Sequence, residues 1–174
     1  SILRKNGLEE KFLVGYIGTH GLCQGLDFIL SAADCITDST IHFLFVGDGA
    51  DKSHLMKTST LRKNKNVTFL DSIPKYEMPK YLSLLDISLI PLRKSKTFTT
   101  VIPSKIFEAA AAERAILLGV EGEAERLVNK FDCGLCYEPE NLEDFLEKLT
   151  TLRNNSTLRN RKAKNGLKLA EKYR

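Results

Sequence analysis

Short apolar runs that alternate with helical patterns constrain the fold of this chain more than any other feature. The runs lack the polar–apolar alternation of a half-exposed strand, which indicates strands buried on both faces. They lie at 12–17, 41–46, 67–70, 87–90, 115–118 and 134–137. Apolar positions with a helical period predict helices at 26–36, 51–62, 77–85, 103–113, 123–131 and 142–152.

The alternation of strand and helix predicts right-handed crossovers and a parallel sheet covered by helices on both faces. We therefore predict an α/β, Rossmann-like three-layer fold with about six parallel strands. A length of 174 residues suits one such domain, and we expect residues 1–174 to form a single ligand-binding domain. Residues 1–11 are interpreted as the remains of a linker, and the chain as a piece of a longer protein.

Composition and charge exclude several classes of protein. Hydrophobic residues make up 43% and charged residues 28%, which is typical of globular domains and not of disordered or fibrous chains. Basic side chains gather near the C-terminus: Arg153, Arg159, Arg161, Lys162, Lys164, Lys168, Lys172 and Arg174. Residues 155–174 are predicted to form a basic helix with few apolar partners. Its charge fits either a solvated face or contact with an anionic membrane surface, and no nucleic-acid partner is expected.

Four cysteines are scattered along the chain, and two of them have the CxxC spacing of zinc and redox sites. They are Cys23, Cys35, Cys133 and Cys136. No second pair and no nearby histidine completes a zinc ligand set. We expect small buried thiols in a cytoplasmic protein.

The loop after the first strand is a candidate ligand-binding segment, because ligands of open α/β sheets bind at the carboxyl ends of strands. Gly18, Thr19 and Gly21 lie there, and glycines let the backbone approach a ligand closely. Their spacing fits neither the dinucleotide-binding GxGxxG motif nor the triphosphate-binding GxxxxGK[ST] motif. For His20, a hydrogen bond to a phosphate or sugar and a solvent-exposed loop position remain alternatives.

The loops after the second and third strands carry weaker signals. The residues Gly47-Asp-Gly49 favour an ordinary turn. The loop around Ile73 has exposed backbone groups suited to the edge of a nucleobase, with a plain connection as the alternative.

The segment after the fourth strand contains more candidate ligand-binding groups than any other part of the chain. Pro103 is expected at the first position of a helix, so that the amides of Ser104, Lys105 and Ile106 lack helical partners and can donate to an anion. Lys105 adds a full positive charge, and Glu108 one turn later suits a ribose diol. An ordinary amphipathic helix with a charged start is the alternative interpretation.

A diphosphate at this position would be neutralised by helix dipoles and by lysine. Arg93, Lys94 and Lys96 supply further positive charge on the preceding loop. No Asp-x-Asp pair is available to hold a divalent metal against a diphosphate, so neither a metal nor a cofactor is expected. The sequence identifies no catalytic residue.

Four stretches, in order along nearly the whole chain, resemble the C-terminal, donor-binding domain of a family 4, GT-B fold glycosyltransferase (glycosyltransferase group 1). They lie at 16–27, 45–49, 66–91 and 103–124, and include a Pro-Ser-Lys-x-x-Glu helix common in bacterial surface polysaccharide assembly. The resemblance implies the C-terminal half of a GT-B fold and a preceding domain that binds the acceptor. It also implies metal-free transfer, with retention of configuration, from a nucleoside-diphosphate sugar. A UDP-sugar is favoured.

The resemblance also implies which residues bind the nucleotide-sugar. They are Gly18, Thr19, Gly21, Ile73, Ser104, Lys105 and Glu108. In the family, the glycine loop lines the diphosphate and the serine and lysine neutralise it. The glutamate bonds the ribose, and the loop after the third strand reads the base.

Two departures from the family pattern leave an alternative function open. Thr100 stands where the family often has a glutamate that contacts the donor sugar, and Leu22 and Gln24 stand where basic residues are common. The alternative is a non-enzymatic nucleotide- or sugar-binding module, or a degenerate glycosyltransferase domain. A GT-B epimerase or phosphorylase fits less well, because its extra acid/base or cofactor residues are not identified.

Overall fold

The computed structural model describes residues 1–174. The strands are β1 (Phe12–Ile17), β2 (Ile41–Val46), β3 (Val67–Leu70), β4 (Ile87–Pro91), β5 (Ala115–Gly119) and β6 (Gly134–Cys136). The helices are α1 (Ile2–Lys5), α2 (Leu26–Asp34), α3 (Lys52–Arg62), α4 (Met78–Leu82), α5 (Lys105–Ala111), α6 (Glu123–Phe131), α7 (Leu142–Asn154) and α8 (Ser156–Lys172). The predicted α/β, Rossmann-like fold with six parallel strands is confirmed. No helix is both long enough and apolar enough to span a membrane.

The chain divides into two compact units, Ser1–Asp86 and Ile87–Arg174. In the first unit, β2 pairs in parallel with both β1 and β3. The register aligns Ile17 with Val46 and Val46 with Leu70, so the carboxyl ends of these three strands meet at one edge. The three loops that follow β1, β2 and β3, which the sequence analysis identified as candidate ligand-binding segments, therefore lie at the same edge of the sheet.

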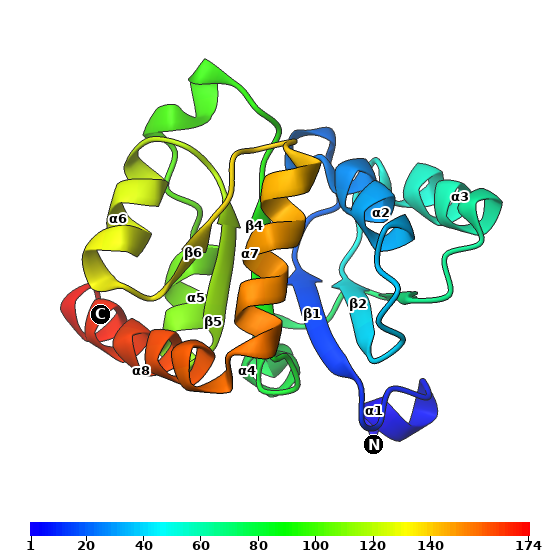
Figure 1. The fold of residues 1–174 in the computed structure, drawn as a ribbon, viewed down its shortest axis with the longest axis horizontal. Helices are drawn as coiled ribbons and strands as arrows, with labels where there is room; N and C mark the ends of the chain where they lie inside the picture. Colours follow the sequence, from blue (N-terminus) through cyan, green and yellow to red (C-terminus); the bar gives the residue numbers. More distant parts are fainter. The chain divides into compact units, whose positions relative to one another are not determined.

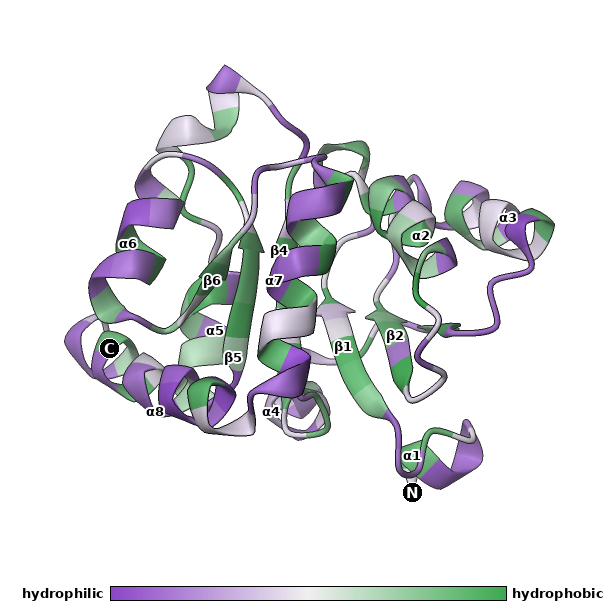
Figure 2. Cartoon of the chain, in the orientation of Figure 1, coloured by the Kyte–Doolittle hydropathy of each residue, from purple (hydrophilic) through white to green (hydrophobic).

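In the second unit, β5 is the middle strand between β4 and β6 (Figure 1). All five of its residues are buried, and Figure 2 shows it hydrophobic along its length. A strand covered on both faces has no solvent side for polar residues. This is why its sequence is a continuous apolar run.

Helix α5 begins later than predicted. Ser104 is its N-cap and Lys105 its first residue, so Pro103 lies before the helix. The Ile106 amide donates to the Pro103 carbonyl at 3.2 Å and the Phe107 amide to the Ser104 carbonyl at 3.0 Å. The expectation that the Ile106 amide lacks a partner is wrong, because the turn at Pro103 supplies one.

Helix α8 packs closely against the rest of the second unit, so the expectation of few packing partners is wrong. Gly166 is buried against α5, where an added Cβ would lie 3.1 Å from the Ala110 Cα. Leu169 is fully buried in the same core, and Lys162 is buried and paired with Asp132. Small residues let the backbones of two helices approach closely, and a count of apolar residues does not reveal such a contact.

We expect Gly166→Leu to lower the free energy of unfolding by about 1–3 kcal/mol, the usual cost of overpacking a tight site. Gly166→Ala is the matched control, because its single methyl needs a shift of only a few tenths of an ångström. Alanine also gains up to about 1 kcal/mol of helix propensity over glycine. Urea denaturation of both variants measures the difference. A leucine variant as stable as the alanine variant would contradict close α5–α8 packing.

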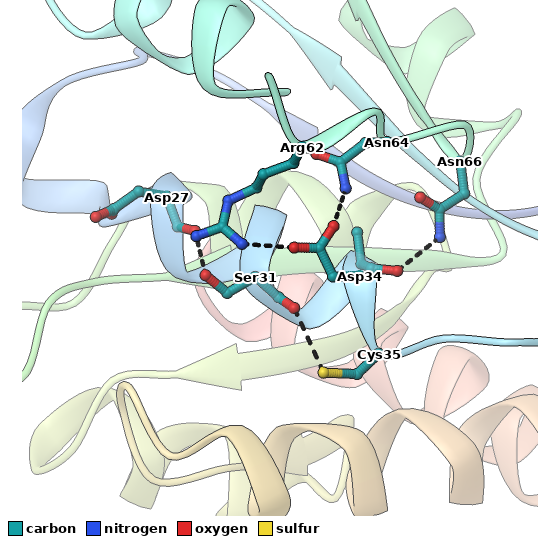
Figure 3. Close-up of polar contacts among 8 residues, drawn as sticks. Asp27, Ser31, Asp34, Cys35, Arg62, Asn64 and Asn66 are labelled. Carbon is teal, nitrogen blue, oxygen red and sulfur yellow. Dashed lines mark hydrogen bonds and ion pairs between the residues drawn. The ribbon is translucent and has the colours of Figure 1, made fainter. Parts of the chain in front are cut away.

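Helix α3 is held by polar contacts as well as by its small buried face, which contains Leu55 and Ser59. Figure 3 shows Asp34, at the end of α2, between two donors. Arg62 pairs with it at 2.5 Å, and the Asn64 side-chain amide donates to its other oxygen. The network ties the end of α3 to α2, which compensates for the weak amphipathic pattern of α3.

The cysteines only partly match the expectation of buried thiols. Cys133 is buried and Cys136 half-buried, and burial raises their pKa values to about 11 and about 12. Cys23 and Cys35 are exposed, so the prediction is wrong for them. Cys23 lies in the short 3-10 helix Leu22–Gln24, and Cys35 caps the end of α2, where neither side chain faces the core.

Candidate functional site

A pocket of about 230 Å³ opens at the carboxyl edge of β1, β2 and β3. Three of the residues predicted to bind a ligand, Gly18, Thr19 and Ile73, line it. The remaining lining residues are Ile17, Val46, Gly47, Asp48, Ser72 and Met78. The structure thus brings together two loops that are more than 50 residues apart in the sequence.

The lining of this pocket is apolar with a few polar groups. Ile17 and Val46 at the strand ends, with Met78 at the start of α4, supply apolar surface. Thr19 and Asp48 supply polar side chains. Such a mixture suits a flat ring with a polar edge, since apolar walls bind the faces and a few polar groups set the orientation.

The glycine loop, residues 18–21, is held in place by hydrogen bonds from its own backbone amides. The Gly18 amide donates to the Val46 carbonyl at 2.9 Å, and the Gly21 amide donates to Gln24 Oε1 at 3.0 Å. Gln24, which departs from the family pattern, therefore caps its own loop. In this arrangement, these two amides are committed within the protein, and Gly21 lies outside the pocket lining.

His20 is fully buried, with an exposed fraction of 0%, so the interpretation as an exposed loop residue is wrong. Its Nδ1 lies 3.0 Å from the Gly18 carbonyl oxygen. The ring packs edge-on against Tyr16 and Phe45 and at a tilt against Phe69. Burial lowers the pKa of His20. The imidazole supports the loop from inside the unit and is not part of the pocket lining.

Lys52 is a residue at this edge that sequence reasoning missed. Its Nζ donates to the carbonyl oxygens of Gly47 at 2.6 Å and Leu70 at 3.0 Å, and pairs with Asp71 at 3.8 Å. A positive charge therefore lies where β2 and β3 end. A lysine in a weakly amphipathic helix is typical of a solvated face, so the sequence held no signal for this role.

In the second unit, Ser104, Lys105 and Glu108 lie at the start of α5. Ser104 is exposed, whereas Lys105 and Glu108 are half-buried. Burial lowers the pKa of Lys105, and the charge of Glu108 partly offsets this effect. The structure places these three predicted residues within one turn and a half of helix, as their spacing requires.

The basic loop before α5 contributes less free charge than the sequence suggested. The Lys94 ammonium donates to Glu138 at 2.8 Å, and the Lys94 amide donates to Glu140 at 2.8 Å. These contacts hold the loop to the segment after β6. No group of three or more His, Cys, Asp or Glu side chains is arranged to hold a metal ion.

The chain is similar in sequence to a known protein family and to curated relatives. The family model described as glycosyl transferases group 1 matches residues 1–169. WcaI of Escherichia coli, a glycosyl transferase named for colanic acid biosynthesis, is 29% identical over 138 residues. That match covers 78% of this chain and 34% of WcaI. The chain spans about a third of the length of this curated relative.

Two solved structures share the fold. HepE of Anabaena, determined in complex with UDP and glucose, superposes with a TM-score of 0.83 at 17% identity. The match covers 98% of this chain and 46% of HepE. The C-terminal domain of the group 1 glycosyl transferase LpcC from Francisella tularensis superposes with a TM-score of 0.76 at 20% identity, covering 97% of this chain and 89% of that domain.

Proposed function

Because the chain belongs to the group 1 glycosyltransferase family, we propose that it is the donor-binding part of a retaining glycosyltransferase. Its substrate is a nucleoside-diphosphate sugar, with a UDP-sugar favoured because HepE was determined with UDP and glucose. The match to WcaI supports a role in bacterial surface polysaccharide or glycolipid assembly.

The pocket at the carboxyl edge of β1–β3 is the observation that carries this proposal. Ligands of open α/β sheets bind at this edge, and the pocket is lined by predicted residues from both the glycine loop and the loop at Ile73. The few polar groups of the lining suit the edge of a nucleobase or sugar. We assign Gly18, Thr19 and Gly21 to the glycine loop that approaches the donor, and Ile73 to the base.

Lys105 has the central electrostatic role in the proposal. As the donor's glycosidic bond breaks, negative charge develops on the departing diphosphate, and fixed cations and donors stabilise it. We assign this role to Lys105 and Ser104, and assign Glu108 to the ribose hydroxyls. A half-buried ammonium is suited to the task, because water screens its charge less than it screens an exposed one.

Two further partners complete the proposal. The acceptor would be bound by a second domain, since the chain covers less than half of HepE. The exposed Arg161, Lys164 and Lys168 keep the surface of α8 basic. We propose that they contact anionic lipid on the cytoplasmic face of the membrane, where a lipid-linked acceptor would lie.

Lys105→Ala should weaken the binding of UDP by about 1–3 kcal/mol, or roughly 5- to 150-fold, because a hydrogen bond to a charged group is lost. Isothermal titration calorimetry of the chain with UDP measures this change. Lys94→Ala is the matched control, because its ammonium is already paired with Glu138. We expect its affinity for UDP to be close to that of the wild type.

Two results would count against the proposed function. One is the absence of UDP, ADP and GDP binding at millimolar concentration. The other is an equal loss of affinity in the Lys94 and Lys105 variants, which would indicate a general charge effect and no specific contact at the start of α5.

A further inference from the structure

His20 is a fully buried titratable side chain beside the pocket, and the proposed reaction does not use it. Its Nδ1 lies 3.0 Å from the Gly18 carbonyl oxygen. A carbonyl oxygen only accepts hydrogen bonds, so Nδ1 must carry the proton. Nε2 then holds a lone pair, and this atom is buried without a hydrogen-bond partner. The contact fixes one tautomer of a neutral ring.

The main chain of His20 is held as firmly as its ring. Its amide donates to the Asp48 carbonyl at 2.8 Å, and its carbonyl accepts from the Asp51 amide at 2.9 Å. Gly49 packs directly against this backbone, since an added Cβ there would lie 2.6 Å from the His20 carbonyl oxygen. The glycine loop and the turn after β2 thus form one closely packed structure.

The same contacts bear on the pocket. Gly18 and Thr19 line it from the glycine loop, and Gly47 and Asp48 line it from the turn after β2. His20 lies behind both segments. The Thr19 carbonyl is held from the same side by the buried Tyr16 hydroxyl at 2.5 Å. Movement of the imidazole would therefore move the wall of the pocket.

We infer that His20 is a positioning residue, whose neutral Nδ1–H tautomer holds the glycine loop in the form that binds the nucleotide of the donor. This inference rests on the proposed function. His20 itself does not touch the donor. It acts through the Gly18 carbonyl and through its packing on the turn after β2.

A second proton on the ring would disturb this arrangement. It would place an N–H donor on Nε2 among the Tyr16, Phe45 and Phe69 rings, where no acceptor lies. The charged groups that act on the ring are Lys52, which disfavours the cation, and Asp48 and Asp51, which favour it. Burial has the largest effect and lowers the pKa of His20. Donor binding should weaken as the ring takes up its second proton at acidic pH.

The test is a titration of UDP into the wild type and three variants at pH 8 and pH 5. His20→Phe keeps a ring but has no donor for Gly18, and we expect affinity at pH 8 at least tenfold weaker than wild type. His20→Asn keeps an N–H donor near the Nδ1 position but cannot titrate. We expect its affinity to lie between those of His20→Phe and the wild type. His54→Asn, on the exposed part of α3, is the control and should bind UDP like the wild type.

The pH profile separates positioning from a merely structural role. Titration of the UDP phosphate cancels when variants are compared at the same pH. We expect the wild type to lose more affinity between pH 8 and pH 5 than His20→Asn does. Equal pH dependence in the wild type and both His20 variants, with equal affinity at pH 8, would overturn the inference.

Nitrogen-15 NMR of the wild type tests the contact without any variant. The Nδ1–H tautomer is expected at pH 7.5, and the Gly18 and Thr19 amide resonances should move with protonation of the His20 ring. An Nε2–H tautomer would overturn the inference even if UDP binds. If the wild type binds no UDP at pH 8 but shows the expected tautomer, the proposed function fails while the loop contact stands.

Discussion

Replacing Gly47 by alanine should lower the free energy of unfolding by about 3 kcal/mol or more and abolish measurable UDP binding. Gly47 has a φ of +143°, which L side chains rarely adopt, and an added Cβ would lie 2.0 Å from the Gly18 carbonyl oxygen. Backbone strain alone costs about 1–3 kcal/mol. The clash adds to it, since the obstacle is the backbone of the glycine loop and not a flexible side chain.

Gly7→Ala is the control for a positive φ in open space. Gly7 also has a positive φ, +66°, but no atom lies within 4 Å of an added Cβ. We expect this variant to lose only about 1 kcal/mol, the usual cost of a left-handed residue. Urea denaturation and calorimetry with UDP measure both variants. Equal losses of stability would show that the Gly47–Gly18 approach is not needed, and unchanged UDP binding in Gly47→Ala would remove that approach from the donor site.

Acidification from pH 6.5 to pH 4 should lower the free energy of unfolding by about 3 kcal/mol through His42 alone. His42 lies on β2 and is 7% exposed, and its Nε2 lies 2.7 Å from the Thr68 hydroxyl. Burial, with a smaller effect of Lys11, lowers its pKa from 6.5 to about 4. In this window, the unfolded chain binds a proton that the folded chain does not, so stability falls as the pH falls. Each pKa unit corresponds to about 1.4 kcal/mol.

His42→Gln isolates this effect, because glutamine keeps an amide near the Nε2 position but does not titrate. Chemical denaturation at several pH values should show a shallower acid slope for His42→Gln than for the wild type. His54→Gln, which changes an exposed side chain, is the control and should keep the wild-type slope. If His42→Gln loses stability as steeply as the wild type between pH 6.5 and pH 4, His42 is not the group responsible.

The strands could be predicted from the sequence almost to the residue, and α6 was predicted correctly at both ends. One or both ends of α2, α4 and α5 were missed by two or three residues. β1, β2 and β3 match the predicted runs. Burial on both faces leaves a local apolar signature in β1 and β2, whereas β3 is an edge strand and only half-buried, so the prediction of burial on both faces is wrong for it. The start of α5 was predicted two residues too early, because the Pro103 carbonyl is used in a turn before the helix begins. Such a turn depends on the local path of the backbone. The spacing of apolar residues does not reveal that path, so it could not locate the first residue of the helix.

The close docking of α8 and the inward position of His20 were not predicted, and the alternative that placed His20 at the surface is wrong. Gly166 lets α8 pack closely against Ala110 of α5 because it has no side chain. A glycine gives no apolar signal in the sequence, so this contact could not be predicted. His20 lies in a glycine-rich loop, which suggests exposure. It is buried because Tyr16, Phe45 and Phe69, from three neighbouring strands, surround it.

The sequence by itself determined the fold class and the loops that meet at the carboxyl edge of β1–β3, because these follow from hydrophobic patterning and from the geometry of parallel strands. Only the tertiary structure decided how the polar groups at that edge are used. It committed the amides of Gly18 and Gly21 to the protein's own acceptors and brought the Lys52 ammonium to the ends of β2 and β3. Hydrogen bonds between residues far apart in the sequence depend on distances of a few tenths of an ångström, which residue type and spacing along the chain do not encode.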